Sequence, residues 1–241
     1  AGMSLKHLFL LRPQIVPQTS VKHTASVIFL HGSGDSGFGV RQWVSDLIDD
    51  ELTFPHIRMI YPTAPERPYT PMGGQISTVW FNRRRIAIND SEDLESTDYM
   101  CEKINELIDA VVSNGTPEER ILLGGFSMGG AMALHVAYRH KRKLAGVFAL
   151  SAFLNKDSAV YKSLQGQSGP LPPLFQCHGG KDPLVLEPWG EDTSKTLQSL
   201  GVQTIYRTFP NLYHQMNTRE IMQLKEWIFT RLPNLDAASN S

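Results

Sequence analysis

The sequence predicts one α/β domain, in which a mainly parallel sheet is covered by helices on both faces. Short apolar runs alternate along the chain with longer stretches of helical periodicity, as in βαβ units. The length of 241 residues fits one domain of this class. Because no repeat or low-complexity tract is present, we expect residues 1–241 to form a single domain, with 1–3 as a cloning remnant or start and about 234–241 as a frayed tail.

The expected strands are apolar runs bounded by glycine, proline or polar residues. The first, 6–11, is separated from 26–30 by a stretch containing proline and threonine, which is typical of an edge strand followed by a more central one. The further expected strands are 56–61, 121–123, 145–150, 204–209 and the run that begins at Pro172 and ends before Gly179.

Apolar residues recurring at helical spacing predict the helices. Their expected ranges are 40–52, 94–112, 131–138, 193–200 and 218–232. The segment 66–93 shows no sustained period, and a stretch of this length in a compact domain is typical of a functional loop or lid. Within it, Trp80 and Phe81 either close over a pocket or pin the loop to the core, and Arg83–Arg85 form either a solvated face or an anion-binding patch.

Composition excludes several classes of function. With 23 basic and 24 acidic residues, the chain offers no excess charge for a polyanion, so we expect no nucleic-acid partner. Cys101 and Cys177 provide no disulfide framework and suit a reducing compartment, which indicates the cytoplasm. No apolar run is long enough to span a bilayer, so we expect at most transient contact with a membrane surface. We also expect a monomer or weak dimer.

One stretch carries the strongest chemical signal. The apolar run Ile121–Leu123 meets Gly125 and Gly129, which flank Ser127, before a helical stretch begins at 131. G-x-S-x-G at such a strand-to-helix reversal is the nucleophile elbow of the α/β-hydrolase fold, which exposes a serine hydroxyl on a strained turn. The motif alone also occurs by chance, so its context decides its meaning.

A second glycine-rich loop, His31–Gly37, follows the strand 26–30. It lacks G-K-[ST], which excludes a P-loop, and its spacing differs from the dinucleotide fingerprint G-x-G-x-x-G. The remaining interpretations are an oxyanion donor, since α/β-hydrolases take one amide from this loop, or a plain flexible turn.

Three polar residues follow strands in the order Ser127, Asp182 and His214, which is the order of α/β-hydrolase triads. A serine needs a neutral imidazole to accept its proton, and a carboxylate fixes the imidazole tautomer. His214 lies on a loop before the last helix, from which it can reach the elbow. His31 and His178 precede glycines and are expected to shape their loops. Structural roles are expected for His7, His23, His56, His135 and His140.

Paired Cys/His spacing and the H-E-x-x-H motif are both absent from the sequence, so we expect no metal and no cofactor.

With these residues assembled, the chain resembles the acyl-protein thioesterase and lysophospholipase family of serine hydrolases, and within it the lysophospholipase-like branch. The matching segments are Val27–Gly32 with Gly34–Gly37, Tyr61–Pro65, Trp80–Phe81, Gly124–Ala131, Leu144–Val147, Gln176–Gly179 with Asp182–Val185, and His214. The resemblance implies that Ser127 is the nucleophile, His214 the base and Asp182 its orienting acid. It also implies that the backbone amides of Ser33 and Met128 form the oxyanion hole.

Departures from the family pattern bear on the substrate. Family thioesterases have Gln where Met128 stands, which a backbone donor tolerates, Leu where Ser33 stands, and an apolar lid where this chain has 70–77. Losing apolar surface near the mouth predicts short acyl groups, because each buried methylene contributes about 0.8 kcal/mol. We expect Trp80, Ile76 and Leu184 to line the substrate pocket.

The expected function is therefore hydrolysis of acyl esters and thioesters through an acyl-Ser127 intermediate, with acylated small molecules or S-acylated proteins as substrates. Two alternatives remain from the sequence. One is a lysophospholipase acting on lysolipids. The other is a non-catalytic binding module on a hydrolase fold, whose expected sign would be a missing triad member.

Overall fold

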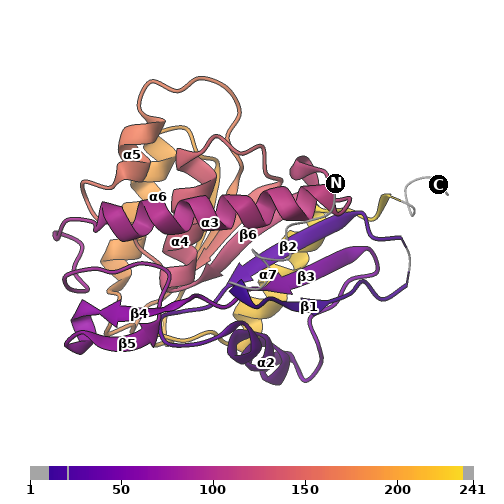
Figure 1. Ribbon diagram of the computed structural model, residues 1–241, viewed down its shortest axis with the longest axis horizontal. Helices are drawn as coiled ribbons and strands as arrows, with labels where there is room; N and C mark the ends of the chain where they lie inside the picture. The colour runs from indigo at the N-terminus through magenta and orange to yellow at the C-terminus, as the bar shows by residue number, and fades with distance from the viewer. Residues whose placement is uncertain (1–10, 21, 236–241) are drawn as a thin grey trace.

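A twisted sheet runs through the centre of the protein (Figure 1). The computed structural model describes residues 11–20 and 22–235, and within them seven strands form this sheet in the order β1-β3-β2-β6-β7-β8-β9. Only β1 is antiparallel to its neighbour among these strands. The strands are β1 (Gln14–Val16), β2 (Ala25–Leu30), β3 (Ile57–Tyr61), β6 (Ile121–Phe126), β7 (Gly146–Leu150), β8 (Leu174–Gly179) and β9 (Thr204–Phe209).

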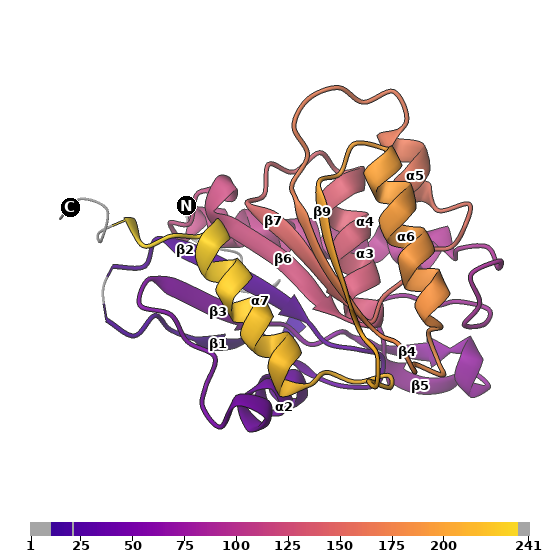
Figure 2. The ribbon, with the colours of Figure 1, turned by 180° about the vertical axis from the view of Figure 1, so that it is seen from behind.

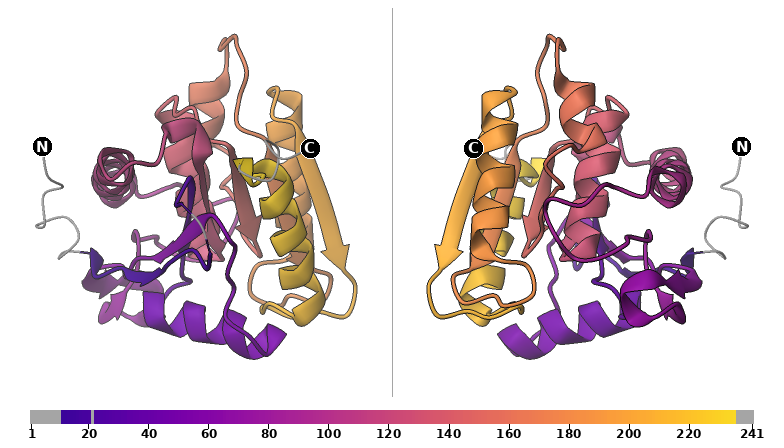
Figure 3. Two further views of the ribbon diagram at one scale, coloured as in Figure 1. Left: turned by 90° about the vertical axis from the view of Figure 1, so that its right-hand side faces the viewer. Right: turned by 90° about the vertical axis from the view of Figure 1, so that its left-hand side faces the viewer.

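Helices cover both faces of the sheet. One face packs against α3 (Leu94–Ser113), α4 (Met128–Arg139), α5 (Ala159–Leu164) and α6 (Glu187–Ser199). Figure 2 shows the other face, which packs against α2 (Gly37–Ile48) and α7 (Thr218–Arg231). Strands β2, β6 and β7 are buried along their whole length, as expected for apolar runs in a parallel sheet covered on both sides. The predicted α/β-hydrolase architecture is confirmed, and end-on views show its layers (Figure 3).

A small hairpin corrects one expectation. Within 66–93, where no regular structure was predicted, β4 (Glu66–Tyr69) and β5 (Gln75–Thr78) pair antiparallel around the short 3₁₀ helix η1 (Thr70–Met72). Gly73 and Gly74 turn this hairpin with φ of 68° and 82°. Its strands carry few buried side chains, so they lack the apolar alternation that a sequence pattern detects.

Other boundaries also differ from the prediction. The edge strand is β1, whereas the predicted strand 6–11 lies outside the described residues except for Leu11. Helix α6 begins six residues earlier than expected, at Glu187 rather than at 193, because Pro188 fits the first helical turn. Helix α5 was not predicted, and the 3₁₀ turn η2 (Glu118–Arg120) precedes β6.

Among the helices in the described ranges, none combines the length and the apolar character that crossing a bilayer requires.

Candidate active site

Ser127 stands at the turn between β6 and α4, at the carboxyl end of the central strands. Its φ and ψ are 54° and −120°, an unusual conformation for a residue with a side chain, and its amide donates to the carbonyl of Leu150 at 2.7 Å. The turn therefore holds the serine between strand and helix with its backbone fixed, as the elbow motif predicts.

The flanking glycines allow this turn because backbone passes through the space that side chains would need. A Cβ on Gly125 would lie 2.5 Å from the Leu30 carbonyl oxygen, and a Cβ on Gly129 would lie 2.2 Å from the same atom. Both contacts are with backbone, which cannot move aside like a flexible side chain. The G-x-S-x-G spacing is thus a packing requirement at the junction of β2, β6 and α4.

The structure brings Ser127, His214 and Asp182 into one hydrogen-bonded chain. His214 Nε2 lies 3.0 Å from Ser127 Oγ, and His214 Nδ1 lies 2.7 Å from Asp182 Oδ2. His214 comes from the loop between β9 and α7, and its ring lies 5.1 Å from that of Phe126. In this geometry the imidazole can accept the serine proton at Nε2 while Nδ1–H donates to the carboxylate.

Asp182 is prepared for this role by the turn after β8. Its side chain is fully buried, and Oδ1 accepts hydrogen bonds from the amides of Leu184 and Val185, each at 2.9 Å. Burial opposes the charged form, but the hydrogen bond and charge of His214 together with the two amides outweigh it and lower the pKa of Asp182. The carboxylate therefore stays ionised beside the imidazole.

His178 and His31 shape their loops, as expected from their positions before glycine. His178 Nε2 donates to the Val185 carbonyl at 2.7 Å, which closes the turn that carries Asp182. His31 Nδ1 donates to the Gly32 carbonyl at 2.6 Å, while its Nε2 accepts from the amide of Ala64 at 2.9 Å. Burial lowers the pKa of His31, in keeping with a neutral ring that needs one donor and one acceptor nitrogen.

Two backbone amides border the serine. Neither the amide of Ser33, in the loop after β2, nor that of Met128, the first residue of α4, donates a hydrogen bond within the described part of the chain. Free N–H groups at a loop and a helix N-terminus are suited to receive a developing negative charge. The loop is fixed from below by Trp80, whose indole N–H donates to the His31 carbonyl at 2.8 Å.

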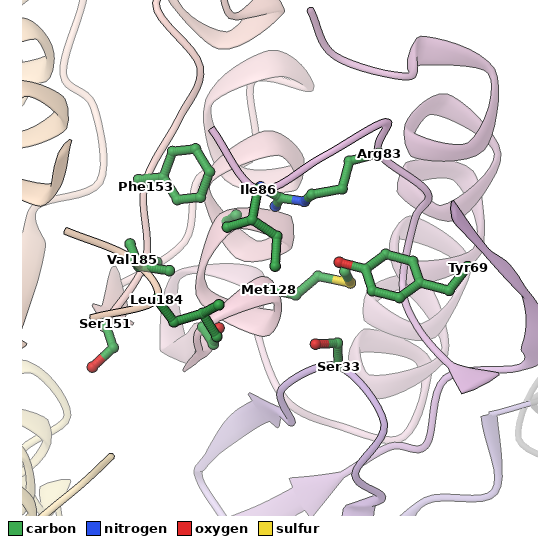
Figure 4. Close-up of a pocket in the computed structure, with 12 residues that line it drawn as sticks. Ser33, Tyr69, Arg83, Ile86, Met128, Ser151, Phe153, Leu184 and Val185 are labelled. Carbon is green, nitrogen blue, oxygen red and sulfur yellow. The ribbon is translucent and has the colours of Figure 1, made fainter. Parts of the chain in front are cut away.

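A narrow cavity of about 20 Å³ opens beside Ser127. This is little more than the ~10–15 Å³ that one water molecule needs. Its wall contains polar and apolar side chains from distant parts of the chain (Figure 4). The lining residues are Ser33, Tyr69, Arg83, Ile86, Ser127, Met128, Ala131, Ser151, Ala152, Phe153, Leu184 and Val185.

Of the three predicted pocket residues, only Leu184 lines the cavity. Leu184 lines the cavity and is 45% exposed at its mouth. Trp80 does not line it, because it is completely buried beneath the loop of His31 and supports that loop instead. Ile76 does not line it either, because the β4–β5 hairpin holds it 61% exposed on the surface.

Sequence reasoning missed the residues that close the cavity. Tyr69, Arg83 and Ile86 come from the segment 66–93, and Phe153 follows β7. Of the predicted arginine run, Arg84 and Arg85 are exposed and bind Asp90, whereas Arg83 is buried. The only signal for Arg83 was its place in that run.

No group of His, Cys, Asp and Glu side chains in the described ranges is arranged to hold a metal ion. The sheet, the elbow and the Ser–His–Asp chain define a serine hydrolase of the α/β-hydrolase class.

Comparisons with known proteins place the chain within that class. Residues 12–232 match the phospholipase/carboxylesterase family. Lysophospholipase-like protein 1 of Mus musculus is 53% identical over 221 residues, covering 92% of each chain. Acyl-protein thioesterase 1 of Cryptococcus neoformans is 34% identical, covering 95% of this chain and 98% of that protein. Among solved structures, acyl-protein thioesterase 2 of Zea mays is similar with a TM-score of 0.75 at 26% identity, covering 92% of this chain and 99% of the other.

This chain belongs to the phospholipase/carboxylesterase family, and the resemblance expected from its motifs is confirmed.

Proposed function

We propose that the protein hydrolyses short acyl esters and thioesters through an acyl intermediate on Ser127. The observation that carries the proposal is the hydrogen-bonded chain from Ser127 Oγ through His214 to Asp182, at 3.0 and 2.7 Å, beside the cavity. The names of its relatives, acyl-protein thioesterase and lysophospholipase-like protein, support acyl transfer as the reaction.

In the first half of the reaction, Ser127 Oγ attacks the acyl carbon and its proton passes to His214 Nε2. The carbonyl oxygen becomes negative and accepts hydrogen bonds from the amides of Ser33 and Met128, which stabilise it by about 3 kcal/mol each. The bond to the leaving thiol or alcohol then breaks, and the leaving group takes the proton from His214.

In the second half, water attacks the acyl carbon and gives a proton to His214 Nε2. The bond between the acyl carbon and Ser127 Oγ breaks, the proton returns to the serine, and the carboxylic acid departs. Asp182 stays ionised throughout, because its lowered pKa keeps it a carboxylate, and it stabilises the imidazolium in both halves.

The preference for short acyl groups rests on the narrow cavity and the polar segment around it. A cavity of about 20 Å³ buries few methylenes. The apolar side chains Ile76 and Met72 of the hairpin lie on the surface, 61% and 49% exposed, and form no wall of this cavity. A long acyl chain therefore gains little of the about 0.8 kcal/mol per methylene that burial provides.

Rates of hydrolysis across an acyl series from acetyl to palmitoyl, on both oxygen esters and thioesters, test this proposal. We expect kcat/KM to be highest for the shortest groups in both series. A maximum at palmitoyl would contradict the short-chain preference. Loss of activity on one series only would separate esterase from thioesterase activity.

A lysophospholipase is the second candidate, favoured by the name of the mouse relative. Release of fatty acid from a lysolipid at a rate equal to that of an acetyl ester would favour it. A non-catalytic binding module is disfavoured, because all three side chains of the triad are present and connected.

For the setting of this reaction we propose the cytoplasm and S-acylated proteins or acylated small molecules as substrates. Two free, buried cysteines support a reducing compartment. Fluorescence localisation of the tagged chain, and release of short acyl groups from S-acylated peptides, would test the two parts.

A further inference from the structure

One cationic side chain in the cavity is unused by the proposed mechanism. Arg83 lines the same cavity as Ser127, although it is only 8% exposed. Arginine is rarely buried without a partner, because a charge removed from water must be compensated. Its place in the wall of an active-site cavity therefore calls for an explanation.

The Arg83 guanidinium lies over two aromatic rings. Its Cζ lies 5.1 Å from the centroid of Phe81 and 4.8 Å from that of Phe153. Cation–π contacts stabilise the charge but use none of the N–H donors, which remain able to bind a ligand.

One of those donors has no acceptor in the described part of the chain, because Nε is buried and makes no hydrogen bond. The acid with the strongest electrostatic effect on Arg83 is Glu92, but its oxygens are bound by His135 Nε2, Ser158 Oγ and the amide of Ala159, at 2.8 to 2.9 Å. Glu92 balances part of the charge from a distance and satisfies none of the donors.

Figure 4 shows where the side chain points. Arg83 and Tyr69 enter the cavity from the segment 66–93 and face Leu184 and Val185 on the other side, with Ile86 and Met128 between them. The Tyr69 hydroxyl interacts electrostatically with Arg83. The cavity is thus lined by Ser127 with its neighbouring free amides, and also by the guanidinium of Arg83 and the hydroxyl of Tyr69.

We propose that Arg83 binds a carboxylate at the far end of a short acyl group, so that the preferred substrates are half esters or half thioesters of short dicarboxylic acids. This inference rests on the proposed function and specifies its substrate class. A guanidinium matches a carboxylate through two parallel N–H···O bonds, whereas the apolar wall of Ile86, Ala152 and Phe153 suits the methylenes between the two ends. Because the cavity itself has room for little more than one water, the exposed Leu184 side chain must move aside for such a group to enter. Of the run Arg83–Arg85, only Arg84 and Arg85 then form a solvated face, and Arg83 is the anion-binding residue.

The anion is assigned to the acyl group, because Arg83 and Ser127 line the same narrow cavity. The acyl group must stay in place on Ser127 while the leaving group departs and water enters. A group held between Arg83 and Ser127 through both steps is therefore the acyl part. Water cleaves the acyl-serine bond as in the proposed mechanism, and the products are the dicarboxylic acid and free Ser127.

Paired substrates test the proposal. We would measure kcat/KM for a succinyl thioester and a butyryl thioester of the same thiol, with wild type, Arg83→Met, Arg83→Lys and Arg84→Met. Arg84 is the matched control, because its side chain is 75% exposed and its guanidinium pairs with Asp90. Melting temperatures of all four proteins show whether they fold.

We expect wild type to prefer the succinyl thioester. Arg83→Met should lower kcat/KM for it by about 10- to 100-fold, as expected for loss of a charged hydrogen-bonding pair, through a raised KM. The butyryl thioester should change little, Arg83→Lys should retain part of the preference, and Arg84→Met should behave as wild type. Equal losses on both substrates, or a wild type that favours butyryl, would overturn the inference. If wild type cleaved neither thioester, the proposed function itself would fail.

A second measurement uses the unmodified protein, in case Arg83 variants do not fold. Succinate should inhibit hydrolysis of an acetyl ester competitively and more strongly than butyrate does, and equal inhibition would contradict the inference. A further arm compares acetyl esters of a phosphorylated and a neutral alcohol. A strong preference for the phosphorylated ester, without any preference for the succinyl thioester, would place the anion on the leaving group and overturn the assignment to the acyl group.

Discussion

The elbow at Ser127 and the segment 66–93 border the same cavity but are built in opposite ways. The elbow is made of buried strand and helix, in which glycine backbone packs against the Leu30 carbonyl. The segment is a hairpin and an irregular stretch whose surface is largely exposed. It is anchored by a few buried side chains, among them Tyr69, Trp80 and Arg83.

This difference separates chemistry from selectivity. At the elbow, backbone geometry fixes the reacting atom, so few sequences are compatible with it. In the segment, the side chains that reach the cavity depend on backbone contacts, such as the isolated β-bridge between Arg83 and Glu92 and the hydrogen bond from the amide of Gly34 to the carbonyl of Thr78.

The largest effect is expected at the elbow, for loss of the Ser127 hydroxyl. Ser127→Ala should lower kcat on an acetyl ester by a factor on the order of 10⁶, because the nucleophile is lost while the scaffold remains. Turnover of an activated acetyl ester measures it, together with the melting temperature. Ser151→Ala, also in the cavity wall, is the matched control and should keep most of the activity. Turnover retained by Ser127→Ala would remove the elbow from the mechanism.

The sequence predicted the sheet well and the segment poorly, for a physical reason. A strand such as Thr204–Phe209 appears in the structure with the predicted bounds, because its own residues favour an extended backbone. The hairpin around Gly73 was missed because it buries few side chains, and the helix Ala159–Leu164 because six residues are too short to show a helical period.

In the candidate site, too, some residues could be predicted from the sequence and others could not. Ser127, Asp182 and His214 each follow a strand, and strand ends meet at one edge of a parallel sheet, so their meeting was predictable from order alone. The burial of Arg83 was not predictable, because it depends on Phe153, a residue far away in sequence. The assignment of Trp80 to the pocket was wrong, because Trp80 is completely buried and its indole N–H donates to the His31 carbonyl.

A second prediction compares one glycine from each region. In Gly129→Ala the new Cβ would lie 2.2 Å from the Leu30 carbonyl oxygen, so the turn must distort, at a cost of about 3 kcal/mol in the free energy of unfolding. In Gly73→Ala the Cβ meets nothing within 4 Å, and only the φ of 68° costs energy, about 1 kcal/mol.

Urea unfolding gives both values, and hydrolysis of an acetyl ester gives the activities. Gly129→Ala should lose most of its activity, because the distortion moves Ser127, while Gly73→Ala should retain it. If the two variants lost similar stability and activity, the elbow would be no more constrained than the hairpin.

The smallest expected effect tests how Trp80, in the segment 66–93, supports the loop that carries His31 and Ser33. Trp80→Phe keeps an aromatic ring but removes the indole N–H that donates to the His31 carbonyl, leaving a buried acceptor unpaired. We expect a loss of about 2 kcal/mol in stability and a lower kcat, because the loop that carries the Ser33 amide loosens. Ile76→Ser, from the same segment, should stay within about 0.5 kcal/mol of wild type, because the side chain is exposed and does not line the cavity.

Measuring kcat and KM separately for Trp80→Phe and Ile76→Ser shows how each residue acts. If Trp80 acts through the oxyanion loop, Trp80→Phe lowers kcat on acetyl and butyryl esters alike and leaves KM near its wild-type value. If it contacted the substrate instead, the loss would depend on acyl length and would fall on KM. A length-dependent loss in Ile76→Ser would mean that the hairpin closes over the cavity during the reaction, and the segment would then act as a moving lid rather than a fixed wall.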